Sequence, residues 1–123
     1  SNAANLMADN KKIITHLEVD PIQVPQKISF PLGLIINEWV TNSIKYAKPP
    51  GGALAITVHI HNGSDAIKIT YSDNGEPQTE KTEKKSLGHD IVNILIKQLD
   101  GTLETKDTNL YHYQLTIPLT DGE

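Results

Sequence analysis

One segment constrains the fold more than any other: residues 31–47 carry apolar side chains at helical spacing and are followed by Pro-Pro-Gly-Gly at 49–52. Proline is favoured in the first turn of a helix, and the later prolines and glycines end it. The core-facing side is predicted to comprise Leu32, Ile36, Trp39, Val40, Ile44 and Ala47. Because such a helix is apolar on one side only, it has to pack against another layer of structure.

The other layer is predicted to be a sheet, because the remaining apolar segments are short and several alternate with polar residues. The expected strands are residues 13–19, 53–61, 66–73, 102–105 and 111–119. The second and third of these flank Asn-Gly-Ser-Asp at 62–65, a turn sequence that indicates an antiparallel hairpin.

A second helix is predicted at residues 87–99. Ile91, Ile94, Leu95 and Gln98 are expected near one face of this helix. Residues 20–31 contain three prolines and are expected to connect elements, whereas the charged residues 75–86 are typical of a functional lid loop. The predicted fold class is therefore α/β: a two-layer α/β sandwich with a mostly antiparallel mixed sheet packed on helices.

The length of 123 residues suits one domain, which is predicted to span residues 13–119. Ser1-Asn2-Ala3 looks like an expression scar, so residues 1–12 are expected to be a scar and flexible lead-in, and residues 120–123 a flexible tail. A net charge of -4 argues against a nucleic-acid binder, and the absence of cysteine excludes disulfides and thiolate metal sites.

Three polar residues of the first helix form a narrow stripe opposite its apolar side. By the helical repeat, Asn42 lies about 40° and Lys45 about 20° from Glu38 around the helix axis. One interpretation is a solvated face with a salt pair, and the other is a site for phosphate and magnesium. The amide oxygen of Asn42 suits Mg²⁺, and the ammonium of Lys45 suits phosphate. Spacing alone leaves both interpretations open.

Asp73 ends the apolar row Ile-x-Ile-x-Tyr of its strand, so its carboxylate is expected to point inward. A buried carboxylate needs a donor, either a backbone amide of the Asp-Asn-Gly turn or an amino group of a ligand. Gly75 would allow the backbone to approach such a ligand closely. Gly88, near the start of the second helix, suits either an ordinary helix start or an anion held by helix amides.

Taken together, these motifs resemble those of a known family. Asn-Glu-Trp-Val-Thr-Asn-Ser-Ile-Lys-Tyr-Ala at 37–47 resembles the N box of histidine kinases. Ser-Asp-Asn-Gly at 72–75 resembles their first glycine box, and Leu-Gly-His-Asp-Ile-Val at 87–92 resembles the second. The order is that of the family, and the resemblance covers roughly residues 13–119. It implies the GHKL, or Bergerat, ATP-binding fold of a two-component sensor histidine kinase.

For the helical motif, the resemblance implies that Asn42 ligates Mg²⁺ between the ATP phosphates and that Lys45 lies near these phosphates as a catalytic residue. Glu38 would be the catalytic base that faces the acceptor histidine, and Tyr46 would contact the nucleotide. The implied cofactors are therefore ATP and Mg²⁺.

For the glycine boxes, the resemblance implies that Asp73 accepts a hydrogen bond from the amino group of adenine. Gly75 would let adenine pack against the backbone, and Leu87 and Gly88 would lie beside the phosphates at the end of the lid. All four residues are thus expected to bind the nucleotide.

Some positions depart from the family pattern. Pro77 replaces the second glycine of the first box, Ser86 replaces the first glycine of the second box, and Leu110-Tyr111 replaces a late Gly-Thr. A lid segment with phenylalanine is also missing. Proline fixes φ and removes a donor, so these departures favour weaker ATP binding or a short, specialised lid.

The implied activity is transfer of the ATP γ-phosphoryl group to a histidine on a separate helical dimerisation domain of the same parent protein. The receiver domain of a response regulator would take the phosphoryl group next. The phosphoacceptor histidine is expected outside this chain, the parent is expected to be a homodimer, and the domain is expected to be cytoplasmic whether or not the parent is membrane-anchored. Two alternatives remain open: a serine kinase of the anti-sigma-factor type, and a degenerate module of this fold that binds a partner without turnover.

His59 and His61 share one face of a predicted strand, which is a spacing that can chelate a metal ion. No third ligand lies nearby in the sequence. An exposed face of the sheet is therefore the simpler interpretation of this pair.

Overall fold

The computed structural model describes residues 2–8, 11–21, 24–76, 87–108 and 111–119. In chain order, its elements are β1 (Asn2–Ala8), β2 (Lys11–Val19), α1 (Gln26–Tyr46), a short 3₁₀ turn (Pro50–Gly52), β3 (Ala53–Asn62), β4 (Ala66–Asp73), α2 (Leu87–Gln98), β5 (Thr102–Thr108) and β6 (Tyr111–Pro118). The strands predicted at 53–61 and 66–73 and the helix predicted at 87–99 are confirmed to within one residue at each end.

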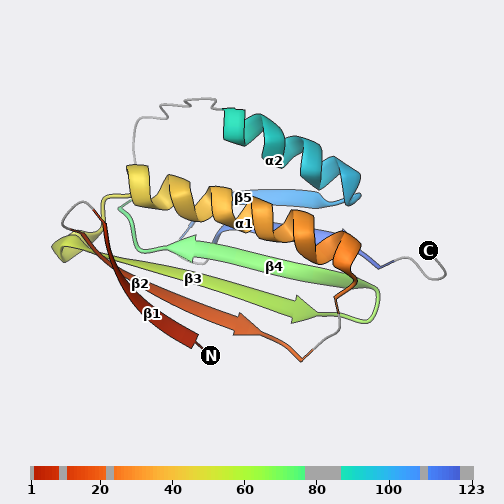
Figure 1. Cartoon of the computed structure of the whole chain (residues 1–123), viewed down its shortest axis with the longest axis horizontal. Coiled ribbons are helices and arrows are strands. Elements are labelled where there is room, and N and C mark those ends of the chain that lie inside the picture. Colours follow the sequence, from red (N-terminus) through yellow and green to blue (C-terminus); the bar gives the residue numbers. More distant parts are fainter. Residues whose placement is uncertain (1, 9–10, 22–23, 77–86, 109–110, 120–123) are drawn as a thin grey trace.

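Within the described residues, the strands form one six-stranded sheet in the order β1-β2-β3-β4-β6-β5. Its neighbours are antiparallel except for β2 and β3, which are parallel because α1 leads the chain back across the sheet between them. Both helices lie on the same face of the sheet (Figure 1). The predicted two-layer α/β sandwich with a mostly antiparallel mixed sheet is therefore confirmed.

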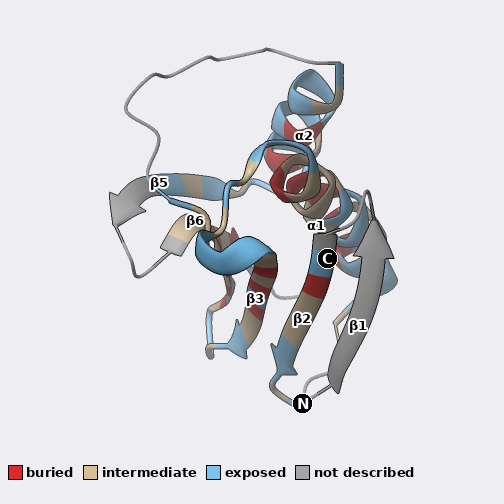
Figure 2. Cartoon of the chain, turned by 90° about the vertical axis from the view of Figure 1, so that its left-hand side faces the viewer, coloured by how far each residue is buried: buried red, intermediate tan, exposed pale blue. Residues whose placement is uncertain are grey.

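The hydrophobic core fills the space between the helices and the sheet, where buried residues of the two layers face each other (Figure 2). The sheet contributes alternate side chains of each central strand, such as Leu54, Ile56 and Val58 of β3. Ile35 of α1 and Ile69 of β4 are fully buried. Burying one such side chain contributes about 1.5–3 kcal/mol relative to leaving it exposed.

Helix α1 begins earlier than predicted. The carbonyl oxygen of Pro25 accepts hydrogen bonds from the N–H groups of Ile28 and Ser29, both at 2.9 Å, and this closes the first turn at Gln26. Pro31 therefore lies inside the helix rather than at its start. The cost of its missing N–H is offset because the early start buries Ile28 in the core.

The predicted core face of α1 is largely confirmed. Leu32 and Trp39 are buried, and the other four predicted residues are partly buried against the core. The sequence pattern missed the burial of Ile35 and Ser43, which extend the buried side toward β4.

The buried side of α2 overlaps only in part with the predicted face. Ile91 and Ile94 are 44% and 56% exposed, whereas Val92 and Ile96 are buried and Leu95 is partly buried. Val92 and Ile96 are four residues apart, so they form the side of α2 that lies against the rest of the fold. Because this helix contains many isoleucines and leucines, its sequence is compatible with more than one buried face.

Residues 2–8 form β1, within the segment 1–12 that the sequence predicted to be an expression scar and flexible lead-in. β1 pairs antiparallel with β2, from Asn2 opposite Leu17 to Ala8 opposite Lys11. Pairing of this kind satisfies the backbone N–H and C=O groups that β2 would otherwise leave free along its outer edge. The other domain bounds, 13–119 and 120–123, stay predictions. Neither described helix has both the length and the hydropathy that crossing a membrane would require.

Candidate functional site

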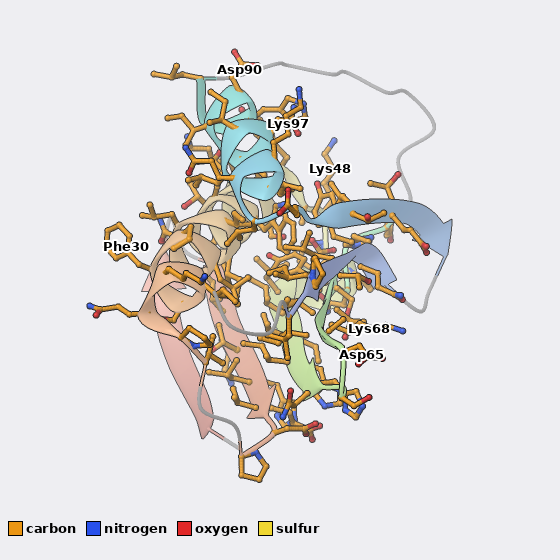
Figure 3. All side chains as sticks on the ribbon, turned by 90° about the vertical axis from the view of Figure 1, so that its right-hand side faces the viewer. Phe30, Lys48, Asp65, Lys68, Asp90 and Lys97 are labelled. Atoms are coloured by element: carbon orange, nitrogen blue, oxygen red, sulfur yellow. The ribbon has the colours of Figure 1, made fainter. Side chains whose placement is uncertain are left out.

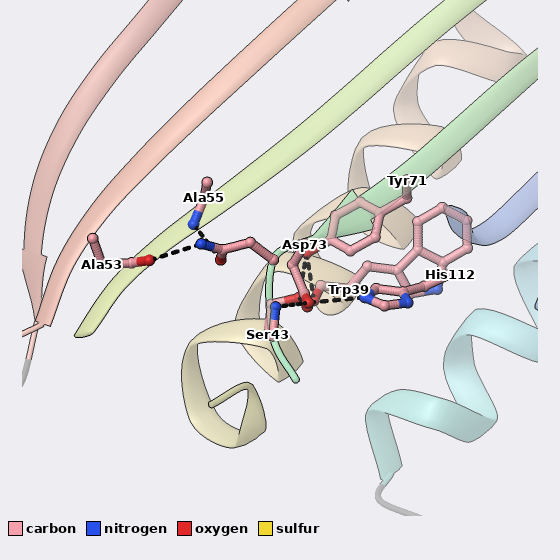
Figure 4. A network of polar contacts seen from close by, with 9 residues as sticks. Trp39, Ser43, Ala53, Ala55, Tyr71, Asp73 and His112 are labelled. Carbon is pink, nitrogen blue, oxygen red and sulfur yellow. Dashed lines mark hydrogen bonds and ion pairs between the residues drawn. The ribbon is translucent and has the colours of Figure 1, made fainter. Parts of the chain in front are cut away.

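The candidate site lies where the end of β4 meets the last turns of α1. Asp73 is the last residue of β4, and only 9% of its side chain is exposed. Its Oδ1 accepts hydrogen bonds from the Gly75 N–H and from His112 Nε2, both at 2.8 Å. Its Oδ2 accepts a hydrogen bond of 2.7 Å from the Ser43 hydroxyl (Figure 4). The inward carboxylate predicted from the strand pattern therefore exists, and both of its oxygens have donors.

Burial by itself would raise the pKa of Asp73. Hydrogen bonds from His112, Ser43 and the Gly75 N–H oppose this effect and together hold the pKa of Asp73 below its ordinary value. Asp73 is therefore an ionised carboxylate at neutral pH, held rigidly at the edge of the core.

A buried hydroxyl continues this network into the core. Tyr71 Oη lies 2.6 Å from Ser43 Oγ and 3.0 Å from the carbonyl oxygen of Trp39. The Ser43 hydroxyl donates its proton to Asp73, and the single proton of Tyr71 is shared between the Trp39 carbonyl oxygen and Ser43 Oγ. Burial first, and the charge of Asp73 second, raise the pKa of Tyr71, which keeps the phenol neutral.

Of the three donors to Asp73, the sequence predicted one as an alternative and gave no signal for the other two. The Gly75 amide is the predicted turn donor, and the turn is anchored by the side chain of Asn74, which bonds the N–H of Ala55 and the carbonyl oxygen of Ala53. Ser43 and His112 were missed. Strand alternation places His112 on the face opposite Leu115 and Ile117, so the pattern gave no signal for it.

The glycine motifs pack closely against α1. A Cβ atom on Gly75 would come within 3.1 Å of the Ala47 Cβ, and the N–H of Glu76 donates to the Lys48 carbonyl oxygen at 2.9 Å. A Cβ atom on Gly88 would collide with the carboxylate of Glu38. The two glycine motifs, distant in sequence, thus both lie against the C-terminal half of α1, which carries the polar helix motif.

The remaining predicted site residues occupy the same two helices. Asn42 is partly buried and immediately precedes Ser43, while Lys45 and Tyr46 are exposed in the last turn of α1. Leu87 is 76% exposed at the start of α2. The roles of these residues stay predictions, and Pro77, Ser86 and Leu110 lie outside the described residues.

Two hollows lie at the other end of α1, with volumes of about 650 and 300 Å³. Lys27 and Pro31 line both of them, and neither includes a predicted site residue. Of the predicted lid only residues 75 and 76 are described, and these follow Asp73 closely in the chain. We therefore place the candidate site by its buried charge and converging motifs rather than by the size of a hollow.

Comparisons with known proteins agree with this geometry. Residues 28–121 match the family described as histidine kinase-, DNA gyrase B-, and HSP90-like ATPase. A comparison with curated protein sequences gives no match.

Solved structures of histidine kinases have the same fold. The histidine kinase domain of a blue-light activated histidine kinase from Erythrobacter litoralis is 22% identical, with a TM-score of 0.74 over 87% of this chain and 52% of that one. Histidine kinase AdeS of Acinetobacter baumannii is 16% identical, with a TM-score of 0.67 over 92% of this chain and 57% of that one. The catalytic domain of histidine kinase ThkA is 14% identical, with a TM-score of 0.65 over 86% and 78%. The chain thus spans about half the length of the first two structures.

Proposed function

Because the chain belongs to the family of histidine kinase-, DNA gyrase B-, and HSP90-like ATPases, we propose that it is the ATP-binding catalytic domain of a sensor histidine kinase. The observation that carries this proposal is the ionised, almost fully buried Asp73 at the point where the motifs of α1, β4 and α2 converge. A fixed carboxylate at the edge of an apolar core is suited to accept a hydrogen bond from an amino group of a flat, apolar base.

In this proposal, the amino group of adenine donates to Asp73 in the place that His112 Nε2 occupies in the structure. Asp73 keeps its hydrogen bonds from Ser43 and the Gly75 N–H, so the carboxylate stays oriented while the base exchanges with the imidazole. Gly75 has no side chain to obstruct the base, whereas a Cβ atom there would lie 3.0 Å from Asp73 Oδ1 and 3.1 Å from the Ala47 Cβ.

The phosphates are expected at the start of α2. Helix amides at an N-terminus attract anions, and the carboxylate of Glu38 already lies against Gly88 there. Lys45 supplies a positive charge, and the amide oxygen of Asn42 is a hard ligand that fits Mg²⁺. Bound Mg²⁺ would neutralise charge on the phosphates.

Glu38 is proposed as the group that orients or deprotonates the attacking imidazole of the acceptor histidine. Catalysis would come mainly from positioning and from stabilisation of charge on the γ-phosphoryl group. We place the acceptor histidine on a helical dimerisation domain of the parent protein and the receiver domain of a response regulator downstream, with the catalytic domain in the cytoplasm.

One observation favours a second candidate, a degenerate module of this fold that binds a partner without turnover. Both oxygens of Asp73 already have donors from the chain itself, so the carboxylate is satisfied without a nucleotide. Titration calorimetry separates the two candidates, because a module without nucleotide binding gives no heat with millimolar Mg-ATP.

The test of the leading proposal is the substitution Asp73→Asn. Losing the negative charge and one acceptor is expected to weaken binding of Mg-ATP by about tenfold to a hundredfold, as for a hydrogen bond to a charged group. Asp65→Asn, in the exposed β3–β4 turn, is the matched control and should bind as the parent chain does. Thermal melting of both variants checks that they are folded. Equal affinities of Asp73→Asn and the parent chain for Mg-ATP would contradict the proposal.

A further inference from the structure

Three side chains that could hold a metal ion meet on the face of the sheet that the helices leave uncovered. His59 and His61 are two residues apart in β3 and alternate with Val58, which is buried, and Ile60, which is partly buried against the core. Asp20 follows the last residue of β2. Because β2 and β3 are parallel, with Val19 opposite Ile60, the carboxyl ends of both strands bring these three residues together.

The geometry is close to that of a metal site. His61 Nδ1 lies 2.7 Å from Asp20 Oδ2, and His59 Nε2 lies 3.7 Å from Asp20 Oδ1. One ligand atom from each residue lies within 4.8 Å of the others. The ligand atoms of a tetrahedral zinc ion are about 3.3 Å apart, because the Zn–N and Zn–O distances are near 2 Å. Small side-chain rotations would therefore bring the three ligand atoms into position around an ion.

The carboxylate is held in place by the backbone around it. The N–H of Asn62 donates to Asp20 Oδ2 at 3.1 Å, and the N–H of Asp20 donates to the carbonyl oxygen of Ile60 at 3.0 Å. Hydrogen bonds of this kind orient a metal ligand before the ion arrives. Asp20 is therefore fixed against the end of β3. It supplies a third ligand that lies far from His59 and His61 in the sequence.

We propose that Asp20, His59 and His61 bind a divalent transition-metal ion, with Zn²⁺ as the expected ion. Two imidazoles and one carboxylate suit zinc, whereas Mg²⁺ and Ca²⁺ prefer oxygen ligands. Three protein ligands leave a coordination position for water or for a ligand from a partner. A bound ion would link the end of β2 to the end of β3.

This site is separate from the one proposed for nucleotide. Asp73 is opposite Ile56 near the start of β3, whereas His59 and His61 lie toward the end of that strand. Lys68 of β4, labelled in Figure 3, is the cross-strand neighbour of His61, so a positive charge lies beside the proposed cation site. Since Lys68 is exposed on a flexible stem, its ammonium can turn away from a bound cation.

Zinc titration of the full chain without an affinity tag tests the proposal. We expect one Zn²⁺ per chain, and we expect His59→Gln and His61→Gln each to weaken binding by about tenfold or more. His16→Gln is the matched control, because His16 lies on a neighbouring strand outside the trio, and it should leave zinc affinity unchanged. Excess Mg²⁺ should not compete.

Melting of each variant in the presence of a chelator shows whether its fold is intact, so a loss of zinc binding can be read as a loss of ligands. Asp20→Asn gives a further test, because asparagine can still accept the hydrogen bond of Asn62 but is a weaker ligand. Absence of zinc binding in the parent chain would overturn the proposal. So would zinc affinity that survives in the His59→Gln/His61→Gln double variant, or that falls equally in His16→Gln.

Discussion

The single carboxylate of Asp73 shows how a residue can serve both the fold and a site. Its hydrogen bonds to Ser43 and to the Gly75 N–H tie the last turns of α1 to the end of β4. Its third bond, to His112, joins β6 to the same point. Two of these bonds belong to the scaffold that orients the carboxylate, and the third is the one that a ligand would replace.

Replacing His112 with alanine should strengthen nucleotide binding. In the proposed function, the imidazole and the amino group of adenine compete for Asp73 Oδ1, so removing the imidazole removes a cost of binding. We expect Mg-ATP affinity to rise by up to about tenfold, measured by calorimetry. His16→Ala is the control. A fall in affinity for His112→Ala would contradict competition.

Asp73 should also make folding stability depend on acid pH. Because its folded pKa is lower than the value of about 3.9 in an unfolded chain, it stabilises the folded state fully above that value. This contribution is lost as pH falls from there through the folded pKa. In urea unfolding at a series of pH values, Asp73→Asn should therefore lose less stability on acidification than Asp65→Asn. Parallel pH profiles for the two variants would argue against the depressed pKa.

At the scale of elements, α1 is the segment on which the fold most depends. One side contributes Ile28, Leu32, Ile35 and Trp39 to the core, and its last turns carry the predicted site. Its composition is not ideal for a helix, because Gly33 and Pro31 both lie in its interior. Tertiary burial, rather than helix propensity, holds this stretch in place.

Replacing the glycine in α1 with alanine is expected to increase stability. Gly33 is exposed, and a Cβ atom there would meet nothing within 4 Å. Gly33→Ala should raise the free energy of unfolding by about 0.5–1 kcal/mol, because alanine loses less conformational freedom on folding. Urea denaturation measures this change.

The same substitution at Gly63 is expected to have the opposite effect. A Cβ atom there would lie 2.9 Å from the carbonyl oxygen of Ala66, in the turn where the Gly63 N–H bonds that same oxygen. Gly63→Ala should lower stability by about 1–3 kcal/mol. If both variants shift stability in the same direction, the role assigned to local space at Gly33 is wrong.

At the scale of the whole molecule, elements set by local signals could be predicted and contacts set by tertiary pairing could not. Alternation and the turn at 62–65 predicted β3 and β4. The start of α1 was missed because three prolines suggested a connector, although the carbonyl oxygen of one of them closes the first turn. His112 and Asp20 were missed because each meets its partners across the sheet, from strands distant in sequence.

The one parallel pair of the sheet has a consequence for the order in which the chain folds. β3 and β4 are joined by a tight turn, and β1 and β2 are neighbours in sequence, so both hairpins need only short loops to close. β2 and β3 are separated by the whole of α1, and closing so long a loop costs more chain entropy. We therefore expect the two hairpins to form early and β2 to pair with β3 late, after α1 has packed against the sheet.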